Sequence, residues 1–217
     1  MVTNNNLQRD VMEELEYDPG VDHTRIGVAV RDGVVTLSGT VENYVQKLTA
    51  EKAARRVSGV KAIVEELRVE LPFAPATGDG EIARRIVNVL GWDSAFPKKG
   101  IGVKVEDGWV TLSGEVDWHY QTDAARNAAA RIDGVRGVTN LLVVRKQPMA
   151  GDIRQRILDA FERSADVDAS AVHVVTDGGT VRLSGKVKAW HEREMAERAA
   201  WAAPGVTNVE DHIVLSF

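Results

Sequence analysis

"DGVVTLSG" (Asp32–Gly39), "DGWVTLSG" (Asp107–Gly114) and "GGTVRLSG" (Gly178–Gly185) are three versions of one phrase in a single chain of 217 residues. Each version begins at a turn-forming pair, continues as an alternating apolar run and ends in Leu-Ser-Gly. Asp-Gly favours a tight turn between two strands, because the turn needs positive φ angles. The phrase therefore predicts a β-hairpin that occurs three times.

A fixed distance links the phrase to a second signal. A Gly-Val pair begins twenty residues after the last glycine of each phrase, at Gly59-Val60, Gly134-Val135 and Gly205-Val206. The copies are offset by 75 and 71 residues, and this stretch aligns in all three without a gap. Recurrence at a fixed spacing indicates tandem copies of one structural unit.

Each copy predicts five elements in the order helix, strand, strand, helix, strand. The first helix carries apolar residues at i, i+4 and i+8, which form one face: Leu7, Val11, Leu15; Ile82, Ile86, Leu90; Ile153, Ile157, Phe161. The second helix has alanine at three matching places in every copy: Ala50, Ala53, Ala54; Ala125, Ala128, Ala129; Ala196, Ala199, Ala200. Alanine favours helix and permits close packing against a sheet. The Gly-Val pair is expected to end this helix, with glycine at C′.

The predicted fold class is α+β, with three tandem repeats of a small α-β-β-α-β unit. Each unit is expected to form a three-stranded mixed sheet with two helices on one face, because that arrangement buries all the apolar stripes. Segments rich in Pro and Gly separate the copies at Leu71–Gly80 and Arg145–Gly151. The predicted domains therefore span residues 1–72, 78–146 and 150–217.

The bulk composition excludes several classes of protein. The net charge of -5 argues against a nucleic-acid binder, which usually has a basic face. The absence of cysteine excludes disulfides and thiolate metal sites. No signal peptide, lipobox or apolar run of transmembrane length is visible. We expect a cytoplasmic protein that is not transmembrane, able at most to attach peripherally to a membrane.

A hairpin with GxVxLxG, an alanine-rich helix, and then GV before a strand resembles the BON domain. The residues that carry the resemblance are the structural glycines Gly33, Gly39, Gly59, Gly108, Gly114, Gly134, Gly179, Gly185 and Gly205, with the aliphatic residues between them. The family occurs in osmotically induced proteins and outer-membrane lipoproteins, and this chain is similar to its cytosolic three-copy members. The resemblance implies a non-catalytic module that binds phospholipid or other surfaces, and it transfers no binding residue.

Nothing in the sequence indicates a catalytic, metal or cofactor site. The five histidines show no HxxxH or HExxH spacing, and no phosphate-binding or nucleophile motif is present. The serines of Leu-Ser-Gly recur, but no histidine recurs with them as a base. We expect these serines to form local hydrogen bonds.

The aromatic residues vary among the copies and are the candidate interaction surface. Trp109 replaces Val34 and Thr180, and its place in the alternation predicts the sheet face away from the helices, where it would pack on a neighbouring domain or on a partner. Tyr44 and Trp190 share a place with His119 at the start of the second helix, and Trp118 and Tyr120 flank that place. These residues would enter a lipid headgroup region or cap the core from its edge.

The prediction is a non-enzymatic, multivalent binding module that attaches to phospholipid surfaces or envelope-associated partners, in an osmotic or other stress response. Three similar units in one chain add weak sites through effective concentration. The alternative is a structural scaffold that self-associates through sheet edges or aromatic faces, without lipid binding.

Overall fold

The computed structural model describes residues 4–71, 78–97, 100–146, 152–164 and 171–216, so most of the two predicted linkers lies outside it. The first repeat contains α1 (Asn4–Tyr17), η1 (His23–Arg25), β1 (Ile26–Arg31), β2 (Val34–Val41), α2 (Tyr44–Arg56) and β3 (Ala62–Val69). The second contains α3 (Asp79–Trp92), β4 (Ile101–Glu106), β5 (Trp109–Val116), α4 (His119–Ala130) and β6 (Gly137–Val144). The third contains α5 (Ile153–Arg163), β7 (Val172–Asp177), β8 (Thr180–Val187), α6 (Trp190–Ala202) and β9 (Asn208–Leu215).

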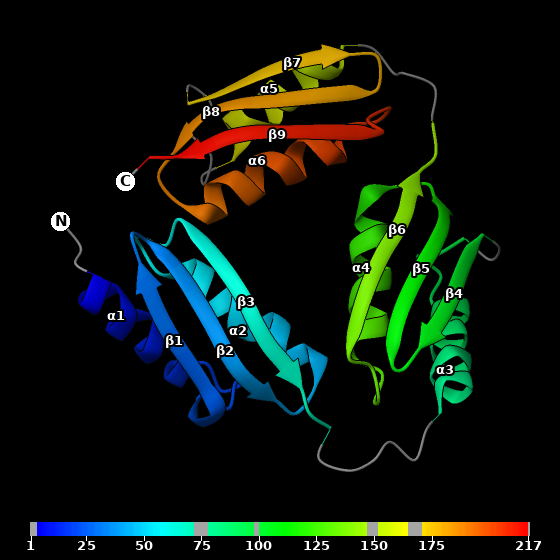
Figure 1. The fold of residues 1–217 in the computed structure, drawn as a ribbon. Coiled ribbons are helices and arrows are strands. Elements are labelled where there is room, and N and C mark those ends of the chain that lie inside the picture. Colours follow the sequence, from blue (N-terminus) through cyan, green and yellow to red (C-terminus); the bar gives the residue numbers. More distant parts are fainter. Residues whose placement is uncertain (1–3, 72–77, 98–99, 147–151, 165–170, 217) are drawn as a thin grey trace. The chain divides into compact units, whose positions relative to one another are not determined.

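Each repeat forms its own three-stranded sheet in which the strand of the quoted phrase is central. In the first repeat β2 pairs antiparallel with β1 and parallel with β3, so the sheet is mixed. The third repeat has the same pairing, with β8 between β7 and β9. The two helices of each repeat lie against one face of the sheet (Figure 1). The predicted α+β class with three tandem α-β-β-α-β units is confirmed.

The core of each unit lies between the sheet and the two helices. In the first repeat Val35, Leu37 and Val41 of β2 are buried, together with Leu7, Val11 and Leu15 of α1. The alanines Ala50, Ala53 and Ala54 are also buried, so α2 lies close against the sheet. The other face of the sheet carries no helix, and we call it the open face.

The glycine that ends the phrase allows two backbone segments to touch. Gly39 has a φ of 116°, and a Cβ there would overlap the carbonyl oxygen of Arg25. Gly114 and Gly185 have φ values of 124° and 137° and meet the backbone of Gly100 and Ala171 in the same way. An L-residue side chain does not fit at these positions.

The glycine of the Gly-Val pair does not occupy the C′ position that the sequence predicts. α2 ends at Arg56, and Gly59 lies three residues later instead of at C′. A turn closed by Val60 N–H to the carbonyl of Val57 at 3.3 Å contains Gly59, whose φ is 93°. A turn with positive φ at its third residue needs glycine. The glycine therefore marks the turn before the last strand, which corrects the predicted C′ role.

The last strand of each repeat contains one backbone N–H that a side chain satisfies. Leu67 N–H donates to Glu65 Oε1 at 2.7 Å, and Ile213 N–H donates to Asp211 Oδ1 at 2.8 Å. In the second repeat Leu142 N–H donates to Asn140 Oδ1 at 3.2 Å. Each acceptor is also held by the second helix, through Lys47, Arg193 and the carbonyl of Thr122. Three different side chains thus perform the same structural task.

Candidate functional site

Trp109 lies on the open face of the second repeat and is 51% exposed. Its indole Nε1–H donates a hydrogen bond of 2.8 Å to Thr139 Oγ1 on β6. Its ring also covers Gly137, because a Cβ at Gly137 would come 2.5–2.8 Å from three ring carbons. The indole therefore fills the space that this glycine leaves on the neighbouring strand, while its outer surface meets solvent.

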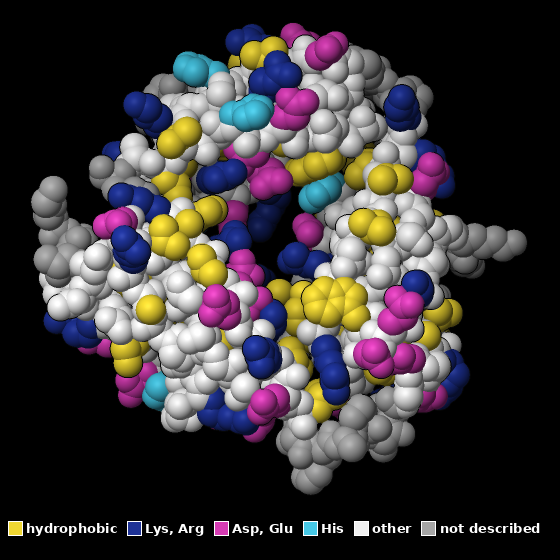
Figure 2. All heavy atoms as spheres, viewed as in Figure 1, with side chains coloured by type: hydrophobic (Ala, Val, Ile, Leu, Met, Phe, Trp, Pro, Cys, Tyr) yellow, Lys and Arg dark blue, Asp and Glu magenta, His cyan; other side chains and the backbone are white. Residues whose placement is uncertain are grey.

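Two further apolar side chains continue this surface along β6. Leu141 and Val143 are 57% and 56% exposed. They alternate with the half-buried Leu142 and Val144, which places them on the open face with Thr139. Figure 2 shows hydrophobic side chains over β6. We call Trp109, Thr139, Leu141 and Val143 the β6 strip.

The other aromatic candidates lie at the start of the second helix of each repeat. Tyr44 and Trp190 are the first residues of α2 and α6, and both are half-buried. Trp118 is half-buried and directly precedes α4, whereas Tyr120 is exposed. Tyr44, Trp118 and Trp190 therefore expose only part of their rings, whereas Tyr120 presents its ring to solvent.

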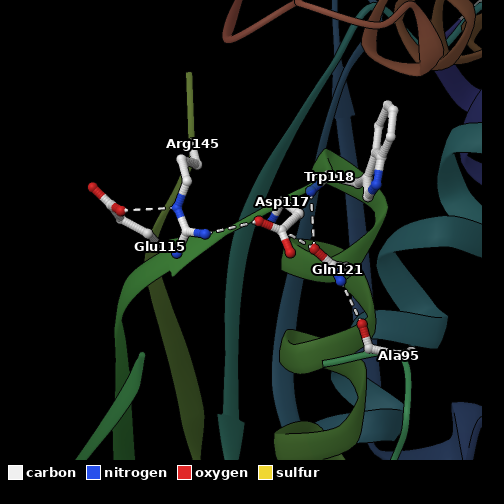
Figure 3. A network of polar contacts seen from close by, with 6 residues as sticks. All are labelled: Ala95, Glu115, Asp117, Trp118, Gln121 and Arg145. Carbon is white, nitrogen blue, oxygen red and sulfur yellow. Dashed lines mark hydrogen bonds and ion pairs between the residues drawn. The ribbon is translucent and has the colours of Figure 1, made fainter. Parts of the chain in front are cut away.

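A polar network fixes the backbone at Trp118 (Figure 3). Gln121 Oε1 accepts the backbone N–H of Asp117 at 2.8 Å and that of Trp118 at 2.9 Å, and its amide nitrogen donates to the carbonyl of Ala95. Arg145 bonds Glu115 at 3.3 Å and Asp117 at 3.2 Å. The bonds to Gln121 satisfy the backbone N–H groups of the two residues before α4, as the third-residue Gln of a capping box does.

The structure does not bring Trp109 and Trp118 together. Trp109 begins β5 and Trp118 follows its end, two residues after Val116. A strand rises about 3.3 Å per residue, so the two residues are separated by roughly 25–30 Å along the chain. The predicted interaction residues of the second repeat therefore belong to two separate surfaces.

Among the described residues, the two most exposed aromatic side chains are ones that the sequence reasoning did not select. Tyr17 ends α1 and is 84% exposed, and Trp92 ends α3 and is 92% exposed. The two positions are related by the offset of 75 residues, and the further offset of 71 leads to Arg163, the exposed last residue of α5. Aligning the repeats by these offsets would have shown that Tyr17 and Trp92 occupy equivalent positions.

The exposed side of α3 combines apolar and basic side chains. Arg85, Val89 and Trp92 recur at i, i+4 and i+7, and all three are exposed. An open hollow in the surface is lined by Asn88, Val89, Trp92 and Asp93. Interfacial helices place such apolar and basic groups side by side.

Glu81 moderates the basic charge of α3. Its carboxylate bonds Arg84 at 2.7 Å and Arg85 at 2.8 Å. Hydrogen bonds from Arg84 and then Arg85 hold the pKa of Glu81 below its usual value of 4.5. The cluster stays ionised at neutral pH with a net charge of about +1.

The described parts of the chain contain no group of three His, Asp or Glu residues that could hold a metal ion.

In the third repeat the pairing register places Ser184 between His173 and His212 on the open face. All three lie in regular strands, and the sequence reasoning missed this row because its members are far apart in the chain.

Among the described residues, none of the helices has the length and apolar character needed to cross a membrane.

Comparison with known proteins gives two curated relatives. The chain is 37% identical over 129 residues to the osmotically-inducible protein Y of Escherichia coli K12, covering 55% of this chain and 64% of that protein. It is 31% identical over 116 residues to the outer membrane lipoprotein DolP of Haemophilus influenzae Rd, covering 52% of this chain and 60% of that protein. The match thus spans less than two thirds of either relative.

Among solved structures, CdsD, a structural protein of the type III secretion system of Chlamydia trachomatis, aligns over 97% of this chain and 92% of its own. Its sequence identity is 17% and its TM-score 0.27, values too low to indicate a shared fold. The family model named BON domain matches residues 3–70, 78–146 and 150–216. The chain therefore belongs to the BON-domain family and carries three copies of the domain in tandem.

Proposed function

We propose that this chain is a non-enzymatic binding protein that attaches peripherally to phospholipid surfaces of the cell envelope during osmotic or related stress. The names of its two curated relatives support the setting, since one is osmotically inducible and the other is an outer membrane lipoprotein. The sequence predicts that the protein lies in the cytoplasm. Fractionation of the native cell tests this prediction.

The observation that carries the proposal is the exposed end of α3. Trp92 is 92% exposed, although tryptophan is a residue that folded proteins usually cover. Tryptophan is enriched at the membrane interface, where its ring meets acyl chains and its N–H meets headgroups. Val89 adds apolar area one turn earlier, and Arg85 adds a cation that can meet a lipid phosphate.

The repeats provide related attachment points of graded strength. Tyr17 stands at the same place in the first repeat, but exposed Glu13 and Glu16 accompany it and would be repelled by an anionic surface. Arg163 stands there in the third repeat, on a helix that also exposes Arg154 and Arg156. We propose that the second repeat supplies the main contact and the third adds electrostatic attraction through effective concentration.

Vesicle co-sedimentation tests this proposal. The full chain is mixed with vesicles of phosphatidylcholine alone or of phosphatidylcholine with phosphatidylglycerol, over a series of salt concentrations. We expect binding that is stronger with phosphatidylglycerol and that weakens with salt, because charges at the surface are screened. Absence of binding to both compositions at low salt would overturn the proposal.

A matched pair of variants tests the role of α3. Trp92→Ala is expected to weaken binding roughly ten-fold or more, since inserting a large apolar side chain contributes at least about 1.5 kcal/mol. Tyr17→Ala removes the equivalent exposed aromatic of the first repeat and is expected to have a smaller effect. Equal loss in both variants, or none in Trp92→Ala, contradicts the assignment of the main contact to α3.

A further inference from the structure

The outer edge of β6 differs from the corresponding edges of the other two repeats. Among the described residues β6 is an edge strand, since the sheet order places it beside β5 alone. Its eight residues, GVTNLLVV, contain no charged side chain. The corresponding strands β3 and β9 carry several acids and bases. Charged residues on an edge strand normally prevent pairing with another chain, and β6 lacks them.

The contrast is sharpest on the open face. The offsets of 75 and 71 residues place Leu141 at the position of Glu66 in the first repeat and of His212 in the third. They likewise relate Val143 to Arg68 and Val214. Leu141 and Val143 thus stand, exposed, at positions where the first repeat has two charges. Apolar exposure beside a free strand edge is typical of a protein interface.

One antiparallel register of two β6 strands brings the exposed apolar residues of both copies together. Residues directly opposite each other lie on the same sheet face, so a two-fold axis at Leu141 pairs it with Leu141 of the second copy. Thr139 then faces Val143 of the second copy, and Gly137 faces Arg145 of the second copy. The two-fold axis generates each of these two contacts twice. The apolar residues of both copies therefore meet at the centre of the interface.

The ends of the strand are also complementary in this register. The indole of Trp109 covers Gly137, so Arg145 of the second copy would lie beside that ring. A guanidinium next to an indole is a favourable cation–π contact. The Arg145 side chain is 52% exposed and bonds Glu115 and Asp117 of its own copy, and these two carboxylates more than offset its charge.

A lipid surface fits the edge less well than a second copy does. The outer N–H and C=O groups of an edge strand find no hydrogen-bond partner in hydrocarbon, which makes insertion of the edge unfavourable. A second strand offers partners to outer groups of this kind and buries Leu141 and Val143 in the same step, while the N–H of Leu142 is already bonded to Asn140 Oδ1 at 3.2 Å. We propose that the edge of β6 is the interface of a homodimer, formed by antiparallel pairing of two β6 strands about a two-fold axis at Leu141.

Cysteine crosslinking tests the interface and its register in the full chain, which contains no cysteine of its own. Opposite residues in an antiparallel pair have Cα atoms about 4.5–5.5 Å apart, within disulfide range. Under mild oxidation Leu141→Cys is expected to form a covalent dimer alone. Thr139→Cys and Val143→Cys are expected to crosslink strongly only when the two variants are mixed.

Glu66→Cys is the matched control, since it occupies the same position on the edge of the first repeat. Equal crosslinking of Glu66→Cys and Leu141→Cys would overturn the proposal, because random collision would then explain both. Strong crosslinking of Thr139→Cys alone would overturn the axis at Leu141. Sedimentation gives a readout that needs no oxidation.

In sedimentation the unmodified chain is expected to form a dimer that dissociates on dilution. Leu141→Glu, which installs the residue of the first repeat, is expected to be monomeric with an unchanged circular dichroism spectrum. An unmodified chain that stays monomeric at all concentrations, or a Leu141→Glu variant that dimerises equally well, would contradict the interface. The test is independent of vesicle binding and leaves Trp92 intact.

Discussion

Trp109 and Gly137 form a cross-strand pair in which an indole ring occupies the space of a missing side chain. The first repeat has Val34 and Ala62 at the equivalent positions, and these face each other in the parallel register of β2 and β3. The same space on the sheet is thus filled in two ways. The second repeat uses a large residue beside a glycine, and the first repeat uses two residues of smaller size. Because the two residues are in contact, we expect them to be energetically coupled.

A double-mutant cycle tests this coupling. Gly137→Ala alone is expected to displace the ring and to lower the free energy of unfolding by about 1–3 kcal/mol. Combining it with Trp109→Val restores the pair of the first repeat, and we expect the double variant to recover most of that loss. Urea unfolding followed by circular dichroism measures the four free energies. Simple additivity of the two single changes would show that the residues are not coupled.

The acceptor in the last strand of the third repeat gives a second prediction. Asp211→Ala removes the partner of Ile213 N–H and of Arg193, and we expect a loss of about 1–3 kcal/mol. Asp211→Asn keeps an oxygen for the N–H, as Asn140 does in the second repeat, and is expected to cost less. Hydrogen exchange of the Ile213 amide reports the bond directly. Faster exchange in Asp211→Asn than in Asp211→Ala would contradict this role.

The glycine at the end of the phrase gives a third prediction. Gly39→Ala combines an unfavourable left-handed conformation, about 1–2 kcal/mol, with overlap against the Arg25 carbonyl. We expect a total loss of roughly 2–4 kcal/mol, measured by thermal unfolding. Gly91→Ala is the control, since its Cβ would meet nothing within 4 Å and alanine favours the helix there. Equal effects of the two changes would be inconsistent with a steric role for Gly39.

Acid stability gives a fourth prediction. Arg56 bonds Asp18 at 2.8 Å and Glu14 at 2.7 Å, which joins α2 to α1 and the residue after it. The hydrogen bond from Arg56 holds the pKa of Asp18 below its usual 3.8. A lowered folded-state pKa stabilises the fold above the unfolded value, and that contribution disappears as pH falls through the folded value.

The melting temperature of the unmodified chain is therefore expected to fall as pH decreases from about 5 to 2. Asp18→Asn cannot ionise, so part of that pH dependence should be absent in the variant while its melting temperature at neutral pH is lower. Parallel melting curves for both proteins across the whole pH range would show that Asp18 contributes nothing to acid sensitivity.

Local pattern was sufficient to predict the units of this fold. Alternation in the quoted phrase, the alanines of the second helix and the stripe of the first helix each reflect burial on one face, and burial follows the period of the element. The role of Gly59 was predicted wrongly, because a glycine near a helix end can serve a C′ position or a following turn. Only the backbone hydrogen bond of Val60 distinguishes the two.

The sequence by itself determined that three copies of one α+β unit are present, because secondary structure and core burial leave periodic traces within each copy. Tertiary structure alone decided which residues of different elements become neighbours. The cover of Gly137 by Trp109, the shared acceptor role of Glu65, Asn140 and Asp211, and the uncharged edge at Leu141 all depend on strand register. Register joins residues roughly thirty positions apart, and no local period encodes such a distance.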